Sequence, residues 1–227
     1  MSAEALPGTT PASPIPGTVA SRPRFSIRKD EAGRLVPRHH SGLDPGLVGE
    51  RAYTHPAVQE WWRWLREEYR PPSPVALVTP CSNVKPYTRS PTSRKVRGLL
   101  RRLGLWGGGA PRGVTWLYFS DLLILVPYER AGDYPACCYE APPDLVLGSQ
   151  ELRSMVTSLL AEAVERLVER GLREAVVFLP RKHLTLWREA REKAAKWPRE
   201  YHTGYTIFST RSLEETLRKT LSLHGQG

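Results

Sequence analysis

The stretch VALVTPCSNVKPYTRSPTSR, residues 75–94, decides the fold because it joins two elements of different character. Residues 75–79 are a short continuous apolar run, which is typical of a strand buried on both faces of a parallel sheet. Ser90 and Pro91 supply a helix cap and a first-turn proline, and apolar residues at helical spacing follow them. Residues 80–89 are therefore predicted to connect a strand to a helix.

The rest of the chain alternates strand and helix patterns. The predicted elements are helices at 56–70, 91–103, 150–170, 182–195 and 211–222, strands at 75–79, 113–120 (which LLILV, 122–126, can extend) and 174–180, and an alternating run at 204–209. Strands separated by helices predict an α/β fold of three layers, in which a mainly parallel sheet is flanked by helices.

The N-terminal segment differs in composition from the remainder. Of residues 1–23, seventeen are Pro, Gly, Ser, Thr or Ala, and such a segment cannot recover the entropy cost of ordering. Residues 24–52 are mixed, with turn chemistry at 30–33 that favours a short hairpin. We therefore divide the chain into a disordered or loosely ordered N-terminal segment, 1–52, and a single α/β domain, 53–227.

Bulk properties exclude several classes of protein. No run approaches the roughly 18 apolar residues that span a bilayer, and the N-terminus lacks the order of a secretory signal. We expect a cytoplasmic protein with no membrane partner. The three cysteines, Cys81, Cys137 and Cys138, form no CxxC spacing, so we expect reduced thiols, no structural metal and no cofactor.

The formal net charge of +10 favours an anionic partner. Between Glu68 and Asp121 there is no acidic residue but nine Lys and Arg. A solvated helix face is the plainer explanation of such a run, but a face of one sign has no local ion pairs. The residues that we expect to contact RNA are Arg89, Arg94, Lys95, Arg97, Arg101 and Arg102.

The connection after the first strand is a candidate site, since ligands of open α/β sheets bind at the carboxyl ends of strands. The start of the following helix suits an anion. Cys81 is either a small buried filler or a nucleophile, which nearby cations and a helix start would favour. Lys85 adds charge, and Tyr87 can stack on a base. Ser90 is explained equally well as a cap or as a ligand contact.

The motif PCSNVKPYTRSPTSR, 80–94, resembles the signature of the archaeosine synthase catalytic domain family, also found in relatives of archaeal tRNA-guanine transglycosylase. That signature reads Pro-Cys, three residues, Lys-Pro-Tyr, two residues, Ser, two residues, His. The matching positions are Pro80, Cys81, Lys85, Pro86, Tyr87 and Ser90. The segments at 55–72 and 125–142 resemble further parts of the family, so the likeness covers about residues 53–180.

This resemblance implies a uracil-DNA-glycosylase-like fold and an enzyme that adds lysine to the nitrile of a 7-deazaguanine base in tRNA. It implies that Cys81 attacks the nitrile, while Lys85 and Tyr87 position the base or protonate its nitrogen. Glu140 would hold the ammonium group of the amine. The residues implied to bind substrate are Pro80, Pro86, Ser90, Ser93, Tyr134, Cys138, Tyr139 and Glu140.

The chain departs from the family pattern where Ser93 and Cys138 replace two histidines. His183 and His202 are possible substitutes, although isolated histidines are more often packing or surface residues. One alternative is therefore a non-catalytic tRNA-binding or accessory subunit. The other is a free-standing catalytic domain that takes RNA binding from a separate RNA-binding or transglycosylase-like protein. A base-removing glycosylase is a further alternative, suggested by fold analogy only. It would need an acidic or asparagine residue in the motif loop to activate water, and residues 79–94 contain no acid and one asparagine, Asn83.

Overall fold

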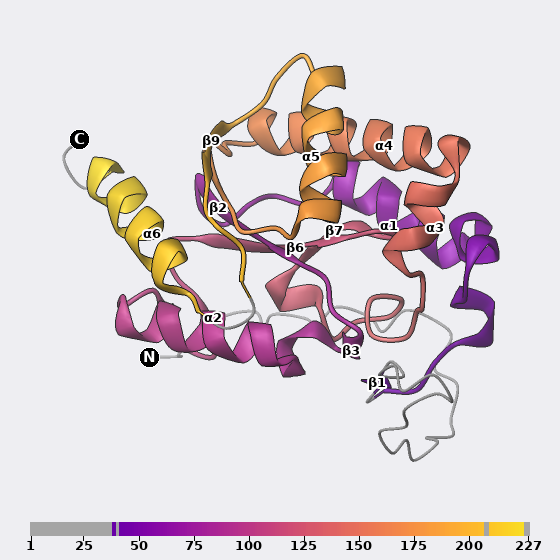
Figure 1. Cartoon of the computed structure of the whole chain (residues 1–227), viewed down its shortest axis with the longest axis horizontal. Helices are drawn as coiled ribbons and strands as arrows, with labels where there is room; N and C mark the ends of the chain where they lie inside the picture. Colours follow the sequence, from indigo (N-terminus) through magenta and orange to yellow (C-terminus); the bar gives the residue numbers. More distant parts are fainter. Residues whose placement is uncertain (1–37, 40, 207–208, 225–227) are drawn as a thin grey trace, which may run out of the picture.

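The computed structural model describes residues 38–39, 41–206 and 209–224 (Figure 1). Its centre is a five-stranded sheet with the strand order β7–β6–β2–β8–β9. The strands are β2 (Val75–Pro80), β6 (Thr115–Ser120), β7 (Ile124–Pro127), β8 (Glu174–Val177) and β9 (Arg199–His202). All neighbouring pairs are parallel except β6 and β7, which confirms the mainly parallel α/β prediction.

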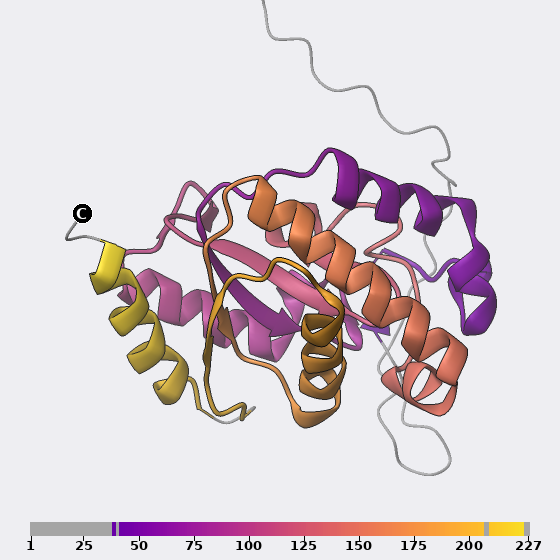
Figure 2. The same ribbon diagram turned by 90° about the horizontal axis from the view of Figure 1, so that it is seen from above.

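Helices cover both faces of this sheet. They are α1 (Pro56–Glu67), α2 (Pro91–Arg102), α3 (Pro143–Gly148), α4 (Gln150–Glu169), α5 (Arg181–Lys193) and α6 (Arg211–His224). In Figure 1, α1, α4 and α5 lie on one side of the sheet and α2 and α6 on the other, and Figure 2 shows α4 and α1 passing over the strands. Every residue of β2 and β6 is buried, as their continuous apolar runs predict.

Serine and histidine side chains cap three of these helices. Oγ of Ser90 accepts a hydrogen bond from the Ser93 amide at the start of α2, and Oγ of Ser149 accepts one from Leu152 at the start of α4. Nδ1 of His55 does the same for α1. The predicted helix starts are therefore confirmed, and each rests on a side chain that satisfies an unpaired backbone N–H.

Small elements complete the described part of the chain. They are the paired strands β1 (Arg38–His39) and β3 (Val84–Lys85), the hairpin of β4 (Trp106–Gly107) and β5 (Ala110–Pro111), and the 3-10 helices η1 (Pro45–Leu47), η2 (Glu50–Thr54), η3 (Tyr87–Arg89) and η4 (Tyr128–Arg130). None of the helices in the described ranges combines the length and the apolar composition needed to cross a membrane.

Two strand predictions differ from the structure. The run LLILV does not extend β6, because the chain reverses after Ser120 and returns as β7. Oγ of Ser120 accepts a hydrogen bond from the Leu123 amide inside this turn, and Ile124 leaves it with a φ of 68°. The last strand, β9, precedes the alternating run at 204–209, of which residues 207 and 208 lie outside the described residues.

The predictions for the N-terminal segment fall mostly outside the described residues, including the tail at 1–23 and the hairpin at 24–38, apart from its last residue. Residues 41–52, which were assigned to that segment, pack on the domain. Leu47 and Ala52 are buried, and the Leu47 carbonyl accepts a hydrogen bond from the Glu140 amide. The packed domain therefore includes residues before 53.

Candidate functional site

Three strand ends meet at one place in the sheet. Cys81 directly follows β2, Asp121 directly follows β6, and His183 lies in the first turn of α5, three residues after Pro180 ends the segment from β8. The chain leaves β2 for β6 on one side and returns to β8 on the other side. Because ligands of open α/β sheets bind where the strand order reverses, this is the expected position of a site.

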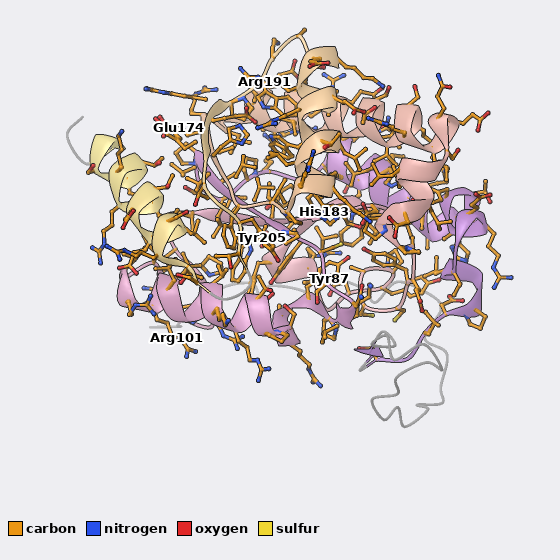
Figure 3. All side chains as sticks on the ribbon, in the orientation of Figure 1. Tyr87, Arg101, Glu174, His183, Arg191 and Tyr205 are labelled. Carbon is orange, nitrogen blue, oxygen red and sulfur yellow. The ribbon has the colours of Figure 1, made fainter. Side chains whose placement is uncertain are left out.

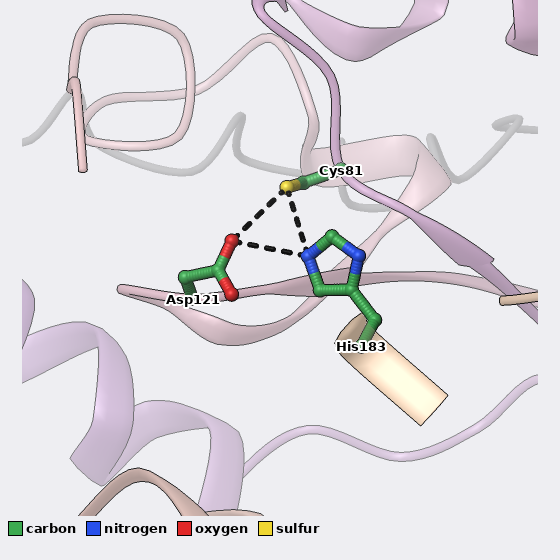
Figure 4. A group of neighbouring side chains, drawn as sticks. All are labelled: Cys81, Asp121 and His183. Carbon is green, nitrogen blue, oxygen red and sulfur yellow. Dashed lines mark hydrogen bonds and ion pairs between the residues drawn. The ribbon is translucent and has the colours of Figure 1, made fainter. Parts of the chain in front are cut away.

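The three side chains converge on one another (Figure 4). Sγ of Cys81 lies 3.6 Å from Oδ2 of Asp121 and 3.7 Å from Nε2 of His183, and the latter two atoms are 3.1 Å apart. Asp121 is 0% exposed and His183 6%, whereas Cys81 is half-buried. The thiol is therefore the group of this cluster that a ligand meets first.

The imidazole of His183 holds its proton strongly. Burial disfavours the charged ring, but the hydrogen bonds to Asp121 and Cys81 and their charges outweigh this and raise the pKa of His183 to about 10. Both contacts involve Nε2, and Nδ1 has no hydrogen-bond partner within the described residues. At neutral pH the ring is a proton donor placed beside the thiol.

Lys85 is buried next to this cluster, with 5% of its surface exposed. Its Nζ lies 4.3 Å from the centre of the Tyr139 ring and 5.6 Å from that of Tyr87, and it donates a 3.3 Å hydrogen bond to the Ser82 carbonyl. Burial lowers the pKa of Lys85, while the charges of Cys81 and Glu140 oppose this shift. The structure therefore brings Lys85 together with four of the predicted site residues, Cys81, Tyr87, Tyr139 and Glu140.

Two tyrosines form a hydrogen-bonded chain with Ser120. The hydroxyl groups of Tyr87 and Tyr139 bond to each other, and the Tyr139 hydroxyl lies 2.6 Å from Oγ of Ser120. Burial, together with neighbouring negative charge, raises the pKa of both phenols well above its usual range. Both tyrosines are therefore neutral and can donate hydrogen bonds. In Figure 3, Tyr87 and His183 lie in the middle of the molecule.

Ser90 and Ser93 have structural partners. Oγ of Ser93 accepts hydrogen bonds from the Tyr118 hydroxyl at 3.1 Å and from Oγ of Ser90 at 2.9 Å, and both serines are buried. They hold the start of α2 against β6. Pro80 is buried at the end of β2, and Pro86 is half-buried beside Lys85.

The segment that carries Tyr134, Cys138 and Glu140 lies against residues 41–49. The Tyr134 hydroxyl, on a side chain that is 40% exposed, donates a 2.7 Å hydrogen bond to Oδ2 of Asp44, whose amide bonds to the Cys138 carbonyl. Sγ of Cys138 contacts that of its neighbour in sequence. Of these residues, only Glu140 acts by its charge on Lys85.

The basic residues predicted to contact RNA lie on α2, except Arg89, which ends η3. Arg97 and Arg101 lie over the Trp106 ring, at 6.0 and 5.7 Å, and Arg102 forms a 3.1 Å ion pair with Glu214 of α6. All of these basic residues are exposed except Arg97, which is half-buried, and Figure 3 shows Arg101 on the outer side of α2. A groove of about 470 Å³ lies between α2 and α6, lined by Lys95, Gly98, Arg102, Ser209, Thr210, Arg211 and Glu214.

Asp121 was not among the residues predicted from the sequence, and His183 was named only as a possible substitute for a missing family histidine. The sequence does mark both residues as candidates, because each follows a predicted strand, as Cys81 does, and ligands bind at the carboxyl ends of strands. Asp121 also interrupts an otherwise apolar run. His202, the other histidine considered, is exposed on β9 and bonds to Glu200 at 3.1 Å.

Fold and site together define an α/β protein with a Cys–His–Asp cluster at the carboxyl edge of a mainly parallel sheet. The chain belongs to the family described as Domain of unknown function (DUF5591), whose model matches residues 58–221. It is similar to "Archaeosine synthase subunit alpha" of Thermoplasma acidophilum, with 26% identity over 126 residues. This match covers 55% of the chain and 22% of the relative, so the chain spans about a fifth of that protein's length.

A solved structure is also similar in part. The crystal structure of AF0587, a protein of unknown function, has a TM-score of 0.47 and 22% sequence identity, and the match covers 70% of this chain and 48% of that one. The predicted resemblance to archaeosine synthase is confirmed as a distant relationship.

Proposed function

We propose that this protein modifies tRNA by adding an amine, with lysine as the expected donor, to the nitrile of a 7-deazaguanine base. The observation that carries the proposal is the contact of the Cys81 thiol with the protonated His183 ring. The distant relationship to a protein named archaeosine synthase supports the choice of substrate. We also propose that the fold described above is of the uracil-DNA-glycosylase type.

In the first step, the Cys81 sulfur, as a thiolate paired with the imidazolium ring of His183, adds to the nitrile carbon. One C–N π bond breaks, a C–S bond forms, and the nitrile nitrogen takes a proton from Nε2 of His183. The product is a thioimidate attached to the enzyme. Asp121, buried against the same ring nitrogen, stabilises the imidazolium before the transfer and orients the ring.

In the second step, the neutral amine attacks the thioimidate carbon. The C–S bond breaks, the sulfur leaves as thiolate, and the proton lost by the amine returns to His183. The net result is addition of an N–H bond across the nitrile, so no oxidant, reductant or nucleotide is consumed.

The neighbouring residues have positioning roles in this proposal. The neutral phenols of Tyr87 and Tyr139 would donate hydrogen bonds to the base or to the nitrile nitrogen. Lys85, whose pKa is lowered by burial and whose Nζ lies near the rings of both tyrosines, would contact the base beside them. Glu140 would attract the ammonium group of a lysine donor.

The test is incubation of the full chain with tRNA that carries the nitrile base, together with lysine, followed by mass spectrometry of the nucleosides. We expect a lysine adduct with the wild type and none with Cys81→Ser, because serine is a far weaker nucleophile. Cys137→Ser, at a cysteine with no role in the proposed reaction, is the matched control and should retain the adduct. If the wild type gives no adduct, alone or with an added RNA-binding partner, the proposal fails.

A non-catalytic tRNA-binding subunit is the second candidate, and the exposed cations of α2 favour it. In that case tRNA would bind with a steep salt dependence, and Cys81→Ser would bind like the wild type while neither forms an adduct. An adduct formed by the wild type would exclude this candidate.

A further inference from the structure

The hydrogen bonds of the Cys81 cluster are arranged unusually for a proton-transfer triad. In such a triad the thiol and the carboxylate contact different nitrogens of the imidazole ring. Here both lie on Nε2 of His183, and Oδ1 of Asp121 and Nδ1 of His183 have no hydrogen-bond partner in the described part of the chain. A single ring N–H cannot satisfy two acceptors equally well. Sγ of Cys81, Oδ2 of Asp121 and Nε2 of His183 therefore surround one point and do not form a linear chain of hydrogen bonds.

The separations of these atoms fit the coordination shell of a metal ion. Zinc bonds to sulfur at about 2.3 Å, to imidazole nitrogen at about 2.0–2.1 Å and to carboxylate oxygen at about 2.0–2.2 Å. With tetrahedral angles, these lengths place the ligand atoms about 3.3–3.6 Å from one another. The observed separations are 3.1, 3.6 and 3.7 Å, and all three atoms lie within 4.8 Å of one another.

The chemistry of the ligands supports the same reading. Thiolate, imidazole and carboxylate are the three ligand types of protein zinc sites, and reactive sites have three protein ligands with the fourth position open. Two of the ligands are buried, and a buried carboxylate is stabilised by a cation in contact with it. The half-buried thiol lies on the accessible side, through which an ion can enter.

We propose that Cys81, Asp121 and His183 bind one thiophilic divalent cation, of the Zn²⁺ class, and that the bound ion blocks the thiol. The ion takes the place of the proton that the imidazole and thiol share, and it draws electron density from the sulfur, which makes the sulfur a weaker nucleophile. Metal binding therefore slows covalent addition at Sγ. This inference goes beyond the proposed function and does not depend on it.

Cobalt titration of the full chain tests the site directly. We expect one Co²⁺ per chain, with a sulfur-to-cobalt charge-transfer band that added Zn²⁺ removes. Cys81→Ser should lose the band, Asp121→Asn and His183→Gln should weaken binding by about tenfold or more, and Cys138→Ser should retain the band at full strength. No band, or a band that Cys81→Ser leaves intact, would overturn the assignment.

A second measurement needs no variant. The rate of Cys81 alkylation by iodoacetamide, followed by peptide mass spectrometry, should fall by about tenfold or more with one equivalent of Zn²⁺ and recover on addition of a chelator. Equal rates with and without Zn²⁺ would contradict the proposed block. Neither measurement requires tRNA, so a missing lysine adduct and a missing metal site are separate results.

Discussion

At the scale of single residues, Lys85 is the group whose burial is hardest to explain by packing. Its ammonium group has one backbone hydrogen bond and two aromatic faces, and burial lowers its pKa. A buried charge costs stability unless it is well paired. The position is therefore better explained by a function at Nζ than by a contribution to the core.

Lys85→Met tests this explanation, since methionine fills a similar volume without a charge. We expect the free energy of unfolding to stay equal or to rise by about 1–4 kcal/mol, while formation of the lysine adduct is lost. Denaturant unfolding measures the first and mass spectrometry the second. Lys219→Met, at an exposed position on α6, is the control and should change neither. A clear loss of stability in Lys85→Met would show that the ammonium group is structural.

Residue types in sequence reveal only part of the site. Cys81, Lys85 and Tyr87 lie within one short motif and can be recognised together. Asp121 and His183 are 40 and 102 positions away from Cys81, so no local pattern links them to it. Residues that come from three strand ends leave no CxxC signature, so cysteine spacing alone does not test the proposed metal site.

At the scale of elements, the start of α2 connects the motif to the sheet. The Ser90 side chain caps the helix and also bonds to Ser93, which accepts a hydrogen bond from Tyr118 of β6. The serine that replaces the family histidine is thus part of a buried polar network. Such networks stabilise a structure only while every member has its partner.

Ser90→Ala should therefore destabilise the protein by about 1–2 kcal/mol, through loss of the cap and of one partner of Ser93. Ser149→Ala, at the half-buried cap of α4, is the matched control and should cost about 1 kcal/mol or less. Denaturant unfolding of both variants gives the comparison. Equal costs would contradict a network role for Ser90.

Helices were easier to predict than the strand reversal at β7. The helices have caps and a regular apolar spacing, and both are local properties. The turn after Ser120 contains no glycine, proline or asparagine, and the φ of 68° falls on Ile124, a residue type that rarely adopts it. A continuous apolar run cannot reveal such a turn, because both strands are buried.

At the scale of the whole molecule, some of the positive charge of α2 is paired with acidic residues that are distant in sequence. Arg102 has no acidic neighbour along the chain but pairs with Glu214 of α6. Arg94 is exposed on the same helix. The surface of α2 therefore stays positive, though less so than the sequence suggests, and it lies on the opposite side of the sheet from α5 (Figure 1).

Arg94→Gln should weaken tRNA binding and reduce the slope of log affinity against log salt by about one, if this residue contacts a phosphate. Arg188→Gln removes the same charge from an exposed position on α5 and is the matched control. Binding titrations at several salt concentrations give both slopes. Equal slopes for the two variants would contradict the prediction that Arg94 of α2 contacts RNA.

The origin of the three cluster residues from separate strand ends also sets when the cluster can exist. During synthesis from the N-terminus, Cys81 is made 102 residues before His183, and Asp121 is made between them. Asp121 follows β6 and His183 follows β8, the two strands that pair with β2 on either side. The complete cluster therefore cannot assemble until most of the domain has been synthesised.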